Sequence, residues 1–484
     1  MKASHGLAKN FVFLMASNVL SPVFSMVLVL AISRLRGVEM LGKYSLVMTV
    51  FIVGQQCAAL GLPILITREV SKRAALAGHY FMNACVLTSA LVAVALVAGL
   101  PIVWSSLDDH EMRIAMSLTL LSLLPSVPMA YGEAVLLAFG RAADYVTVGL
   151  AENVARAILG TVLVLSGYDV AAIAGALLAM RILAGAVLVS ILRRRGVSFA
   201  LRFDRALWRD LLGHVPVLGS IPIVNQIYAR SDIFLLTYFG SWRDVGLYSA
   251  GLRLVDLART LPTAYSKAIY PVLARVHGQS AEEFATVTRR FLRHGLLLMA
   301  PLTIVLCGGS QVLITAFYGQ NAAGGEASLA TLSWTLLPLM IAAVLAQSLF
   351  SAGRQAIDLR VNVISTILNV PSNVVLIRLM GATGAALAML LSMTVYATLQ
   401  YHWTRRHVID PDAIPQVAKI GAVTLASVLV VGALFRTGPV VALIAGLATY
   451  AAAVVALGLV TRDEIGEWRT RVESVGSRYL WGVR

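Results

Sequence analysis

The chain has 484 residues, of which 58% are hydrophobic and 13% are charged, and its formal net charge is +15. Soluble domains are about 45–50% apolar and about 25% charged, so this composition excludes a soluble domain, a disordered chain and a collagen-like chain. The three cysteines lie in apolar runs and the eight histidines are scattered, a pattern that indicates neither a disulfide framework nor a metal site. An integral membrane protein is therefore predicted.

Fourteen apolar segments are long enough to cross a bilayer core, which needs about 20 helical residues. The first six cover roughly residues 10–33, 44–66, 80–104, 113–139, 145–167 and 170–192. The other eight cover roughly residues 211–239, 245–273, 293–318, 328–352, 359–379, 382–403, 416–435 and 440–460. None has the alternating pattern of a barrel strand, and the first is too long for a signal peptide. The predicted fold class is an all-α membrane protein with 14 transmembrane helices.

The basic residues are distributed unevenly over the connections between these segments. With the amino terminus in the cytoplasm, 25 of the 39 Lys and Arg residues fall on inside connections, seven fall outside and seven fall within segments. This bias follows the positive-inside rule and predicts an inner-membrane protein with both termini in the cytoplasm. Because topology accounts for the charge and no basic patch alternates with aromatic residues, no nucleic-acid partner is expected.

Two short motifs recur at nearly the same spacing. The string GKYS at 42–45 opens the second segment, and GLYS at 246–249 opens the eighth, 204 residues later. Likewise GALLAM at 175–180 and GAALAM at 384–389 are 209 residues apart. Both pairs link helix n to helix n+6, which predicts two parallel-repeat lobes. The predicted parts are a lobe at 1–195, a cytoplasmic linker at 196–210, a second lobe at 211–406, a helix pair at 407–463 and a cytoplasmic tail at 464–484.

These strings also carry a family resemblance, together with SRLRG at 33–37, LGLP at 60–63, TREV at 67–70 and RSDIFLL at 230–236. Over essentially its whole length, the chain resembles the polysaccharide flippases of the multidrug/oligosaccharidyl-lipid/polysaccharide (MOP) superfamily. The resemblance implies two six-helix lobes around a central cavity lined by helices 1, 2, 7 and 8. It further implies alternating access that moves a lipid-diphosphate-linked oligosaccharide from the cytoplasmic to the outer leaflet.

Polar residues in the seventh and eighth segments support such a cavity. A charge at mid-bilayer is costly, so membrane-embedded ions normally face a bundle interior or water. The eighth segment has polar residues at helical spacing, which puts them on one face: Ser249, Arg253, Asp256, Thr260, Thr263 and Lys267, widened by Arg259 and Ser266. The seventh segment adds Gln226, Arg230 and Asp232. The cavity is therefore predicted to be polar and cationic.

The predicted cargo explains why the cavity would be cationic. Guanidinium groups pair well with phosphate oxygens, so Arg230, Arg253, Arg259 and Lys267 are expected to bind the diphosphate. Further candidates for the substrate site are Gln226, Asn18, Gln56, Arg34 and Arg68. Asp232 and Asp256 are candidates for coupling to H⁺ or Na⁺, and the membrane potential is the alternative driving force. No catalytic residue, metal or cofactor is predicted, and no Walker motif occurs.

Several of these residues also have a purely structural explanation. Arg253 and Asp256 could neutralise each other three residues apart, as could Glu152 and Arg156 four apart. Arg34 and Arg68 lie near helix ends, where long cationic side chains reach the interface. The run 193–195 is interpreted as an anchoring and topology cluster. Arg181 is isolated in the middle of its segment and has no evident partner.

Other functions remain open. A cation-coupled multidrug or metabolite exporter of the same superfamily is the main alternative, and a lipid-linked peptidoglycan precursor is an alternative cargo. An enzyme is disfavoured because the outward loop that carries Asp108 and Asp109 is too short to build a site. A non-transporting scaffold would need a sealed, dry interior. The expected partners are the lipid-linked diphosphate oligosaccharide and membrane lipids, together with a polysaccharide polymerase or glycosyltransferases.

Overall fold

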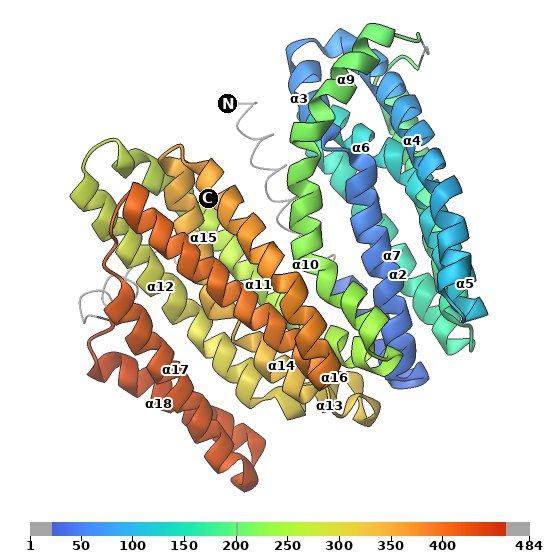
Figure 1. Ribbon diagram of the computed structural model, residues 1–484. Helices are drawn as coiled ribbons and strands as arrows, with labels where there is room; N and C mark the ends of the chain where they lie inside the picture. Colours follow the sequence, from blue (N-terminus) through green and yellow to red (C-terminus); the bar gives the residue numbers. More distant parts are fainter. Residues whose placement is uncertain (1–21, 200–201, 461–484) are drawn as a thin grey trace, which may run out of the picture. The chain divides into compact units, whose positions relative to one another are not determined.

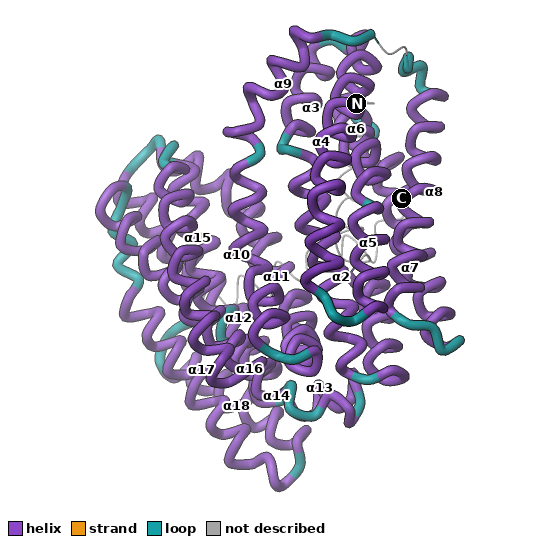
Figure 2. The backbone as a smooth tube through the Cα atoms, turned by 45° about the vertical axis from the view of Figure 1, so that its right-hand side comes forward, coloured by secondary structure: helices purple, strands orange, loops and turns teal. Residues whose placement is uncertain are grey.

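The computed structural model describes residues 22–199 and 202–460. In these ranges the regular secondary structure is helical, and there is no strand (Figures 1 and 2). Residues 22–36 form the first described helix. This agrees with the all-α fold class predicted from the apolar segments.

The helices of the first half overlap the predicted apolar segments, although segments 44–66 and 113–139 are each divided between two helices. Their bounds are α2 Val38–Ala59, α3 Leu62–Lys72, η1 Ala74–Leu76, α4 Ala77–Ser106, α5 His110–Leu121, α6 Leu123–Ala138, α7 Ala142–Leu165, α8 Val170–Arg194 and α9 Arg205–Leu218.

The second half continues in the same way. Its helices are α10 Ser220–Phe239, α11 Trp242–His277, α12 Ala281–Gly308, α13 Ser310–Tyr318, η2 Gln320–Ala322, α14 Glu326–Ser333, α15 Leu336–Ser351, α16 Gln355–His407, α17 Ile414–Leu434, η3 Phe435–Thr437 and α18 Pro439–Ala456.

The number of membrane spans depends on how broken helices are counted. By length and apolar composition, nine described helical stretches could each cross a bilayer, or ten if α2 and α3, bent by 44°, form one span. α16 counts once although two predicted segments lie on it. α11 is not among the nine, and it carries four charged side chains between residues 253 and 267. The total of fourteen spans stays a prediction.

The chain folds into two compact units. The first comprises Met1–Arg253, Ile314–Ser328 and Asn362–Ser392, and the second comprises Leu254–Leu313, Leu329–Val361 and Met393–Arg484. Both α11 and α16 pass from one unit to the other. The lobes 1–195 and 211–406, the linker 196–210 and the helix pair 407–463 stay predictions, and the predicted tail 464–484 lies outside the described residues.

The recurring GxYS motifs form a helix crossing inside the first unit. A Cβ on Gly42 of α2 would lie 2.1 Å from the carbonyl oxygen of Trp242, in the first turn of α11. A Cβ on Gly246 of α11 would lie 2.0 Å from the carbonyl oxygen of Val38, in the first turn of α2. Each glycine thus lies against the residue four positions before its counterpart. The two motifs therefore contact each other in a symmetrical way, and only glycine fits at either position.

α16 is interrupted where the eleventh and twelfth predicted segments meet. Gly381 has φ 55° and ψ −128°, a backbone conformation that is not helical and that glycine adopts readily. Asp244 lies beside this break, and its Oδ1 accepts a hydrogen bond from the backbone N–H of Ala382 at 3.4 Å. The carboxylate therefore lies at the start of the second half of α16, where a negative charge is favourable.

The second unit packs its helices around α12. A Cβ on Gly308 at the end of α12 would lie 2.7 Å from Cγ1 of Val431 on α17. The hydroxyl of Tyr450 on α18 donates to the carbonyl of Leu297 on α12 at 3.1 Å. Close contact at a glycine and a partly buried hydrogen bond thus hold α17 and α18 against α12.

Candidate functional site

A carboxylate is buried inside the first unit, where α10 contacts α11 and α16. Asp232 on α10 is only 2% exposed. The hydroxyl of Tyr248 on α11 donates to its Oδ2, and the backbone N–H of Ile233 donates to its Oδ1 at 2.8 Å. Because an isolated buried charge is strongly disfavoured, these donors are what make a carboxylate tolerable there.

Amide and hydroxyl groups extend the polar interior next to Asp232. The hydroxyl of Ser231 donates to Oδ1 of Asn369 at 3.0 Å, and the amide of Asn369 donates to Ser392 at 2.9 Å. The amide of Asn373 donates to the backbone carbonyl and to Oδ1 of Asn369, both at 3.0 Å. We call this set the Asp232 cluster: Ser231, Asp232, Tyr248, Asn369, Asn373 and Ser392.

One acceptor of the Asp232 cluster is unused. Oδ1 of Asn373 is buried and has no hydrogen-bond partner among the described residues. Carboxylate, amide and hydroxyl oxygens are ligands that hard cations prefer. No group of three or more His, Cys, Asp or Glu side chains that could hold a metal occurs in the described part of the chain. The donor set therefore suits a proton or a hard cation better than a transition metal.

The charged residues of α11 do not form the pair of Arg253 with Asp256 that their spacing suggested. Asp256 pairs with Arg259, with Oδ1 and Nη1 3.2 Å apart, and not with Arg253. Nε and Nη2 of Arg259 are buried without a hydrogen-bond partner among the described residues. Arg253 is partly exposed. The pair leaves Arg259 with unused donors and leaves Arg253 without a carboxylate in the described chain.

The remaining candidates of the second half are accessible to different degrees. Gln226 and Arg230 on α10 are partly exposed, whereas Lys267 on α11 is exposed. Within the described ranges neither Arg230 nor Lys267 forms an ion pair. Both cations thus keep their hydrogen-bonding capacity for another anion.

Arg34, a candidate from the first half, caps a helix. Its Nε donates to the carbonyl of Phe317 at 2.9 Å, and its Nη2 donates to the carbonyl of Ala316. Both carbonyls belong to the last turn of α13, where a cation interacts favourably with the helix dipole. The guanidinium of Arg34 is therefore engaged with backbone carbonyls in this structure.

The structure describes two of the other three first-half candidates. Arg68 on α3 is exposed, and its Nε donates to Glu69 at 2.8 Å. Gln56 on α2 is partly exposed. Asn18 lies outside the described residues.

A buried ion pair in the first unit was not found from the sequence. Glu152 on α7 pairs with Arg181 on α8 at 3.3 Å, so the expected pairing of Glu152 with Arg156 is wrong. Arg156 instead donates to Asn153 at 2.7 Å. Nη2 of Arg181 also donates to Gln55 on α2 at 3.1 Å. The sequence feature that could have indicated this pair is that Glu152 and Arg181 are opposite charges inside two consecutive apolar segments.

The loop before α5 uses the carboxylate of Asp109 for structure. Oδ1 of Asp109 accepts a hydrogen bond from the backbone N–H of Glu111 at 3.0 Å, which caps α5. Its Oδ2 lies 2.5 Å from Nζ of Lys43, and this ammonium holds the pKa of the Asp109 carboxyl below its ordinary value. A carboxylate held by these donors, with its pKa lowered, is a weak general base.

Comparison with known proteins connects this structure to glycan biosynthesis. A family model described as "Polysaccharide biosynthesis protein" matches residues 29–323. The probable flippase AglR of Haloferax volcanii is 30% identical over 206 residues, which cover 40% of this chain and 41% of that protein. The probable low-salt glycan biosynthesis flippase Agl15 of the same organism is 24% identical over 57% of each chain. The matches thus span about two fifths and somewhat more than half of these relatives.

Solved structures share the fold at low sequence identity. A lipid II flippase, MurJ, in an inward closed conformation matches with a TM-score of 0.73 and 13% identity over 92% of this chain and 98% of that one. An inward-facing multidrug transporter of the MATE family of the MOP superfamily matches with a TM-score of 0.68 and 14% identity, over 80% and 94%. The fold is therefore that of MOP-superfamily transporters.

Proposed function

We propose a function for this chain on the ground that it belongs to the polysaccharide biosynthesis protein family, whose model matches residues 29–323. The protein is proposed to be a flippase that moves a lipid-diphosphate-linked oligosaccharide from the cytoplasmic to the outer leaflet by alternating access. Membership in this family is the observation that carries the proposal. It is supported by the transporter fold and by the names of the Haloferax relatives, one called a probable flippase and the other a probable low-salt glycan biosynthesis flippase.

The head group is proposed to bind to the cations of α10 and α11. A diphosphate brings negative charge that must leave water, and guanidinium groups can replace the lost hydrogen bonds. Arg230 and Arg253 have no carboxylate partner among the described residues, and Arg259 keeps unused donors. Cations retained at bilayer depth without a partner are costly unless they serve a ligand. Lys267 is proposed to contribute from its exposed position.

Energy coupling is proposed to use the Asp232 cluster. Its buried carboxylate and the unused Oδ1 of Asn373 suit H⁺ or Na⁺. Asp256, the other coupling candidate, is held by Arg259, which makes it a weaker acceptor for a cation. The membrane potential acting on the cationic residues is the alternative driving force.

The membrane and the orientation of the protein are proposed from the Lys and Arg residues of the connections. The positive-inside bias supports an inner-membrane protein with both termini in the cytoplasm. Enzymes of glycan assembly, a polymerase or glycosyltransferases, are the proposed neighbours, because they make and consume lipid-linked oligosaccharides.

The proposal is tested by reconstituting the full chain in liposomes that carry a fluorescent oligosaccharide linked to a polyprenyl diphosphate. A membrane-impermeant quencher measures how fast the probe changes leaflet. We expect Arg253→Gln and Arg230→Gln each to lower the rate at least about tenfold, the effect of losing a charge-assisted hydrogen bond of roughly 1.5–3 kcal/mol. Arg275→Gln is the matched control, since Arg275 is an exposed arginine near the end of α11.

Two outcomes would contradict the proposal. One is wild-type flipping in the double variant R230Q/R253Q with normal folding. The other is efficient movement of a cationic drug or of a lipid-linked peptidoglycan precursor, in liposomes where the oligosaccharide probe stays in place. The second outcome would assign the protein to one of the alternative cargo classes.

A further inference from the structure

A recess opens on the first unit, apart from the cations of α10 and α11. It has a volume of about 590 Å³ and is formed by α4, α6, α8 and the connection that follows α8. Its walls are mostly apolar and include Met82, Val86, Leu124 and Val189. The lining residues of α4 run from 81 to 89, a rise of about 12 Å along the helix. The recess therefore follows the membrane-spanning helix for a length that several methylene groups would fill.

One end of this recess carries an arginine. Arg193, in the last turn of α8, lines the recess and its Cζ lies 5.3 Å from the ring centroid of Phe199. Arg195 is held by Asp144 at 2.9 Å. Neither Arg193 nor Arg194 has a carboxylate partner in the described part of the chain. The recess thus combines mostly apolar walls with a guanidinium that has no carboxylate partner among the described residues.

The connection after α8 is clamped to α4 and completes the wall. Phe199 contacts Phe81 edge to face, with centroids 5.5 Å apart. The backbone approaches α4 so closely that a Cβ on Gly78 would lie 1.9 Å from the carbonyl oxygen of Ser198. Phe199 is therefore positioned by the chain around it.

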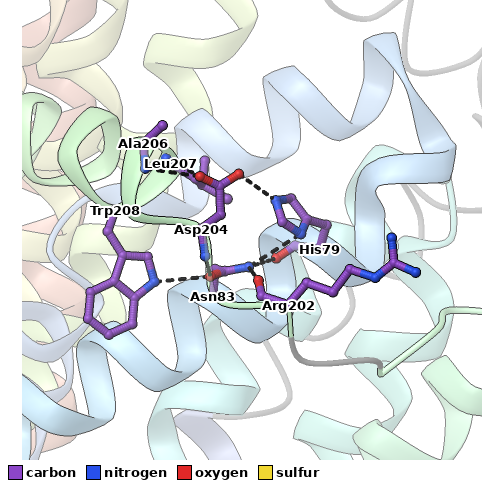
Figure 3. A network of polar contacts seen from close by, with 7 residues as sticks. All are labelled: His79, Asn83, Arg202, Asp204, Ala206, Leu207 and Trp208. Atoms are coloured by element: carbon purple, nitrogen blue, oxygen red, sulfur yellow. Dashed lines mark hydrogen bonds and ion pairs between the residues drawn. The ribbon is translucent and has the colours of Figure 1, made fainter.

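Polar contacts secure the same connection further along. The side chain of Asn83 on α4 donates to the carbonyl of Arg202 at 3.1 Å and accepts from the indole of Trp208 at 3.1 Å (Figure 3). Asp204 contacts Nε2 of His79 at 3.1 Å and caps α9 through the backbone N–H groups of Ala206 and Leu207 (Figure 3). The described parts of this connection are thus held against α4 at Ser198 and Phe199 and again at Arg202, Asp204 and Trp208.

We propose that this recess binds an anionic membrane phospholipid, with one acyl chain along α4 and the phosphate at Arg193. The apolar walls suit a hydrocarbon chain, and the unpaired guanidinium is complementary to a phosphate with net negative charge. Basic pockets between membrane helices on the cytoplasmic side recognise anionic head groups, and the positive-inside pattern predicts that side for Arg193. Because Phe199 forms a wall, the bound lipid also stabilises the docked connection. This site is separate from the proposed cargo site and does not depend on it.

The test uses the purified full chain with a phosphatidylglycerol probe that carries a photoreactive group in one acyl chain. The control probe is phosphatidylcholine with the same chain, and labelled peptides are identified by mass spectrometry. We expect phosphatidylglycerol to label residues 82–89 more strongly than phosphatidylcholine does. Arg193→Gln should lower this labelling about fivefold, the effect of one basic side chain near an anionic lipid, and Arg193→Lys should largely restore it.

The matched control is Arg194→Gln, which removes a neighbouring exposed arginine that does not line the recess and should leave labelling unchanged. Val86→Trp, which fills the recess, should remove labelling without changing the melting temperature greatly. Equal labelling by both probes would overturn the proposal, and so would an equal loss in R194Q. If an unlabelled polyprenyl diphosphate displaces the probe better than phosphatidylglycerol does, the recess belongs to the cargo and the proposal fails.

Discussion

At the scale of single residues, the pair of Glu152 and Arg181 should be costly to break. The two side chains are 4% and 12% exposed, so removing one charge leaves the other buried without compensation. We expect Glu152→Gln to lower the free energy of unfolding by about 3–5 kcal/mol, the range for breaking a buried pair. The melting temperature of the purified protein should fall accordingly.

A double variant separates the ionic effect from the loss of packing. E152Q/R181M removes both charges and should recover much of the stability lost in E152Q, because no uncompensated charge remains. Glu39→Gln, at an exposed position on α2, serves as the control. A double variant as unstable as the sum of two single variants would show that the pair does not interact.

A second prediction at this scale concerns the pH dependence of the docked connection. The backbone N–H of Leu207, together with His79, holds the pKa of the Asp204 carboxyl below its ordinary value. A depressed folded-state pKa means that the contribution of Asp204 is complete above the unfolded value of about 3.9 and is lost as the pH falls through the folded value. Hydrogen exchange at residues 202–210 should therefore stay constant from pH 8 to 5, after correction for intrinsic rates, and rise only below about pH 4.

The matched variant for this prediction is Asp204→Asn. It should raise exchange at residues 202–210 at every pH and abolish the change below pH 4. A wild-type transition near neutral pH would contradict the assignment to Asp204.

Individual charges could be identified from the sequence, whereas their partners could not. Asp232 is recognisable as a charge within an apolar segment, but its cluster includes Asn369 and Ser392, which lie more than 130 residues further along the chain. Helical spacing defines which residues share a face of one helix, but not which other helix that face meets. Within α11, spacing alone does not decide between Arg253 and Arg259, each three residues from Asp256, and in the structure Asp256 pairs with Arg259.

At the scale of elements, the crossing of α2 and α11 should tolerate no side chain at its two glycines. Gly42→Ala and Gly246→Ala each introduce a Cβ about 2 Å from a backbone oxygen of the other helix. The helices must move apart, and we expect a loss of about 1–3 kcal/mol in stability, as for other overpacked sites. Thermal unfolding of the purified variants measures the effect.

The control for the crossing is Gly149→Ala in α7, where a Cβ would meet nothing within 4 Å. This substitution should be neutral or stabilising, since alanine favours a helix more than glycine does. In the double variant G42A/G246A the cost should be less than additive, because one separation of the helices relieves both contacts. Strict additivity would mean that the two glycines do not share one crossing.

Helix positions could be predicted closely because hydropathy reports them directly, and the break of α16 lies at Gly381 between two predicted segments. The crossing itself could not be predicted in detail. The GxYS repeat indicated equivalent positions in two halves, but a repeat does not state that its two copies touch. That contact depends on how α2 and α11 approach, which is set by packing over many residues.

At the scale of the whole molecule, family membership and fold indicate transport, and the proposed cycle needs an energy source. If the Asp232 cluster carries one cation in each cycle, a membrane potential of 100 mV supplies about 2.3 kcal/mol for every charge that crosses. That energy is available only if cation binding at Asp232 is linked to movement of the cargo. The cargo is proposed to bind to the cations of α10 and α11. Because those residues differ from Asp232, a variant of Asp232 can remove coupling without removing cargo binding.

This separation predicts the behaviour of Asp232→Asn in liposomes that carry the fluorescent oligosaccharide lipid. Wild-type flipping should accelerate when either a Na⁺ gradient or a proton gradient is imposed. The gradient that accelerates it identifies the coupling ion. Asp232→Asn keeps hydrogen-bonding atoms for Tyr248 but cannot carry a negative charge. Its rate should therefore equal the wild-type rate without a gradient and should not respond to one, whereas Asp256→Asn should still respond. If the D232N variant still responded to a gradient, the proposal for Asp232 would be wrong. The driving force would then be the membrane potential acting on the arginines.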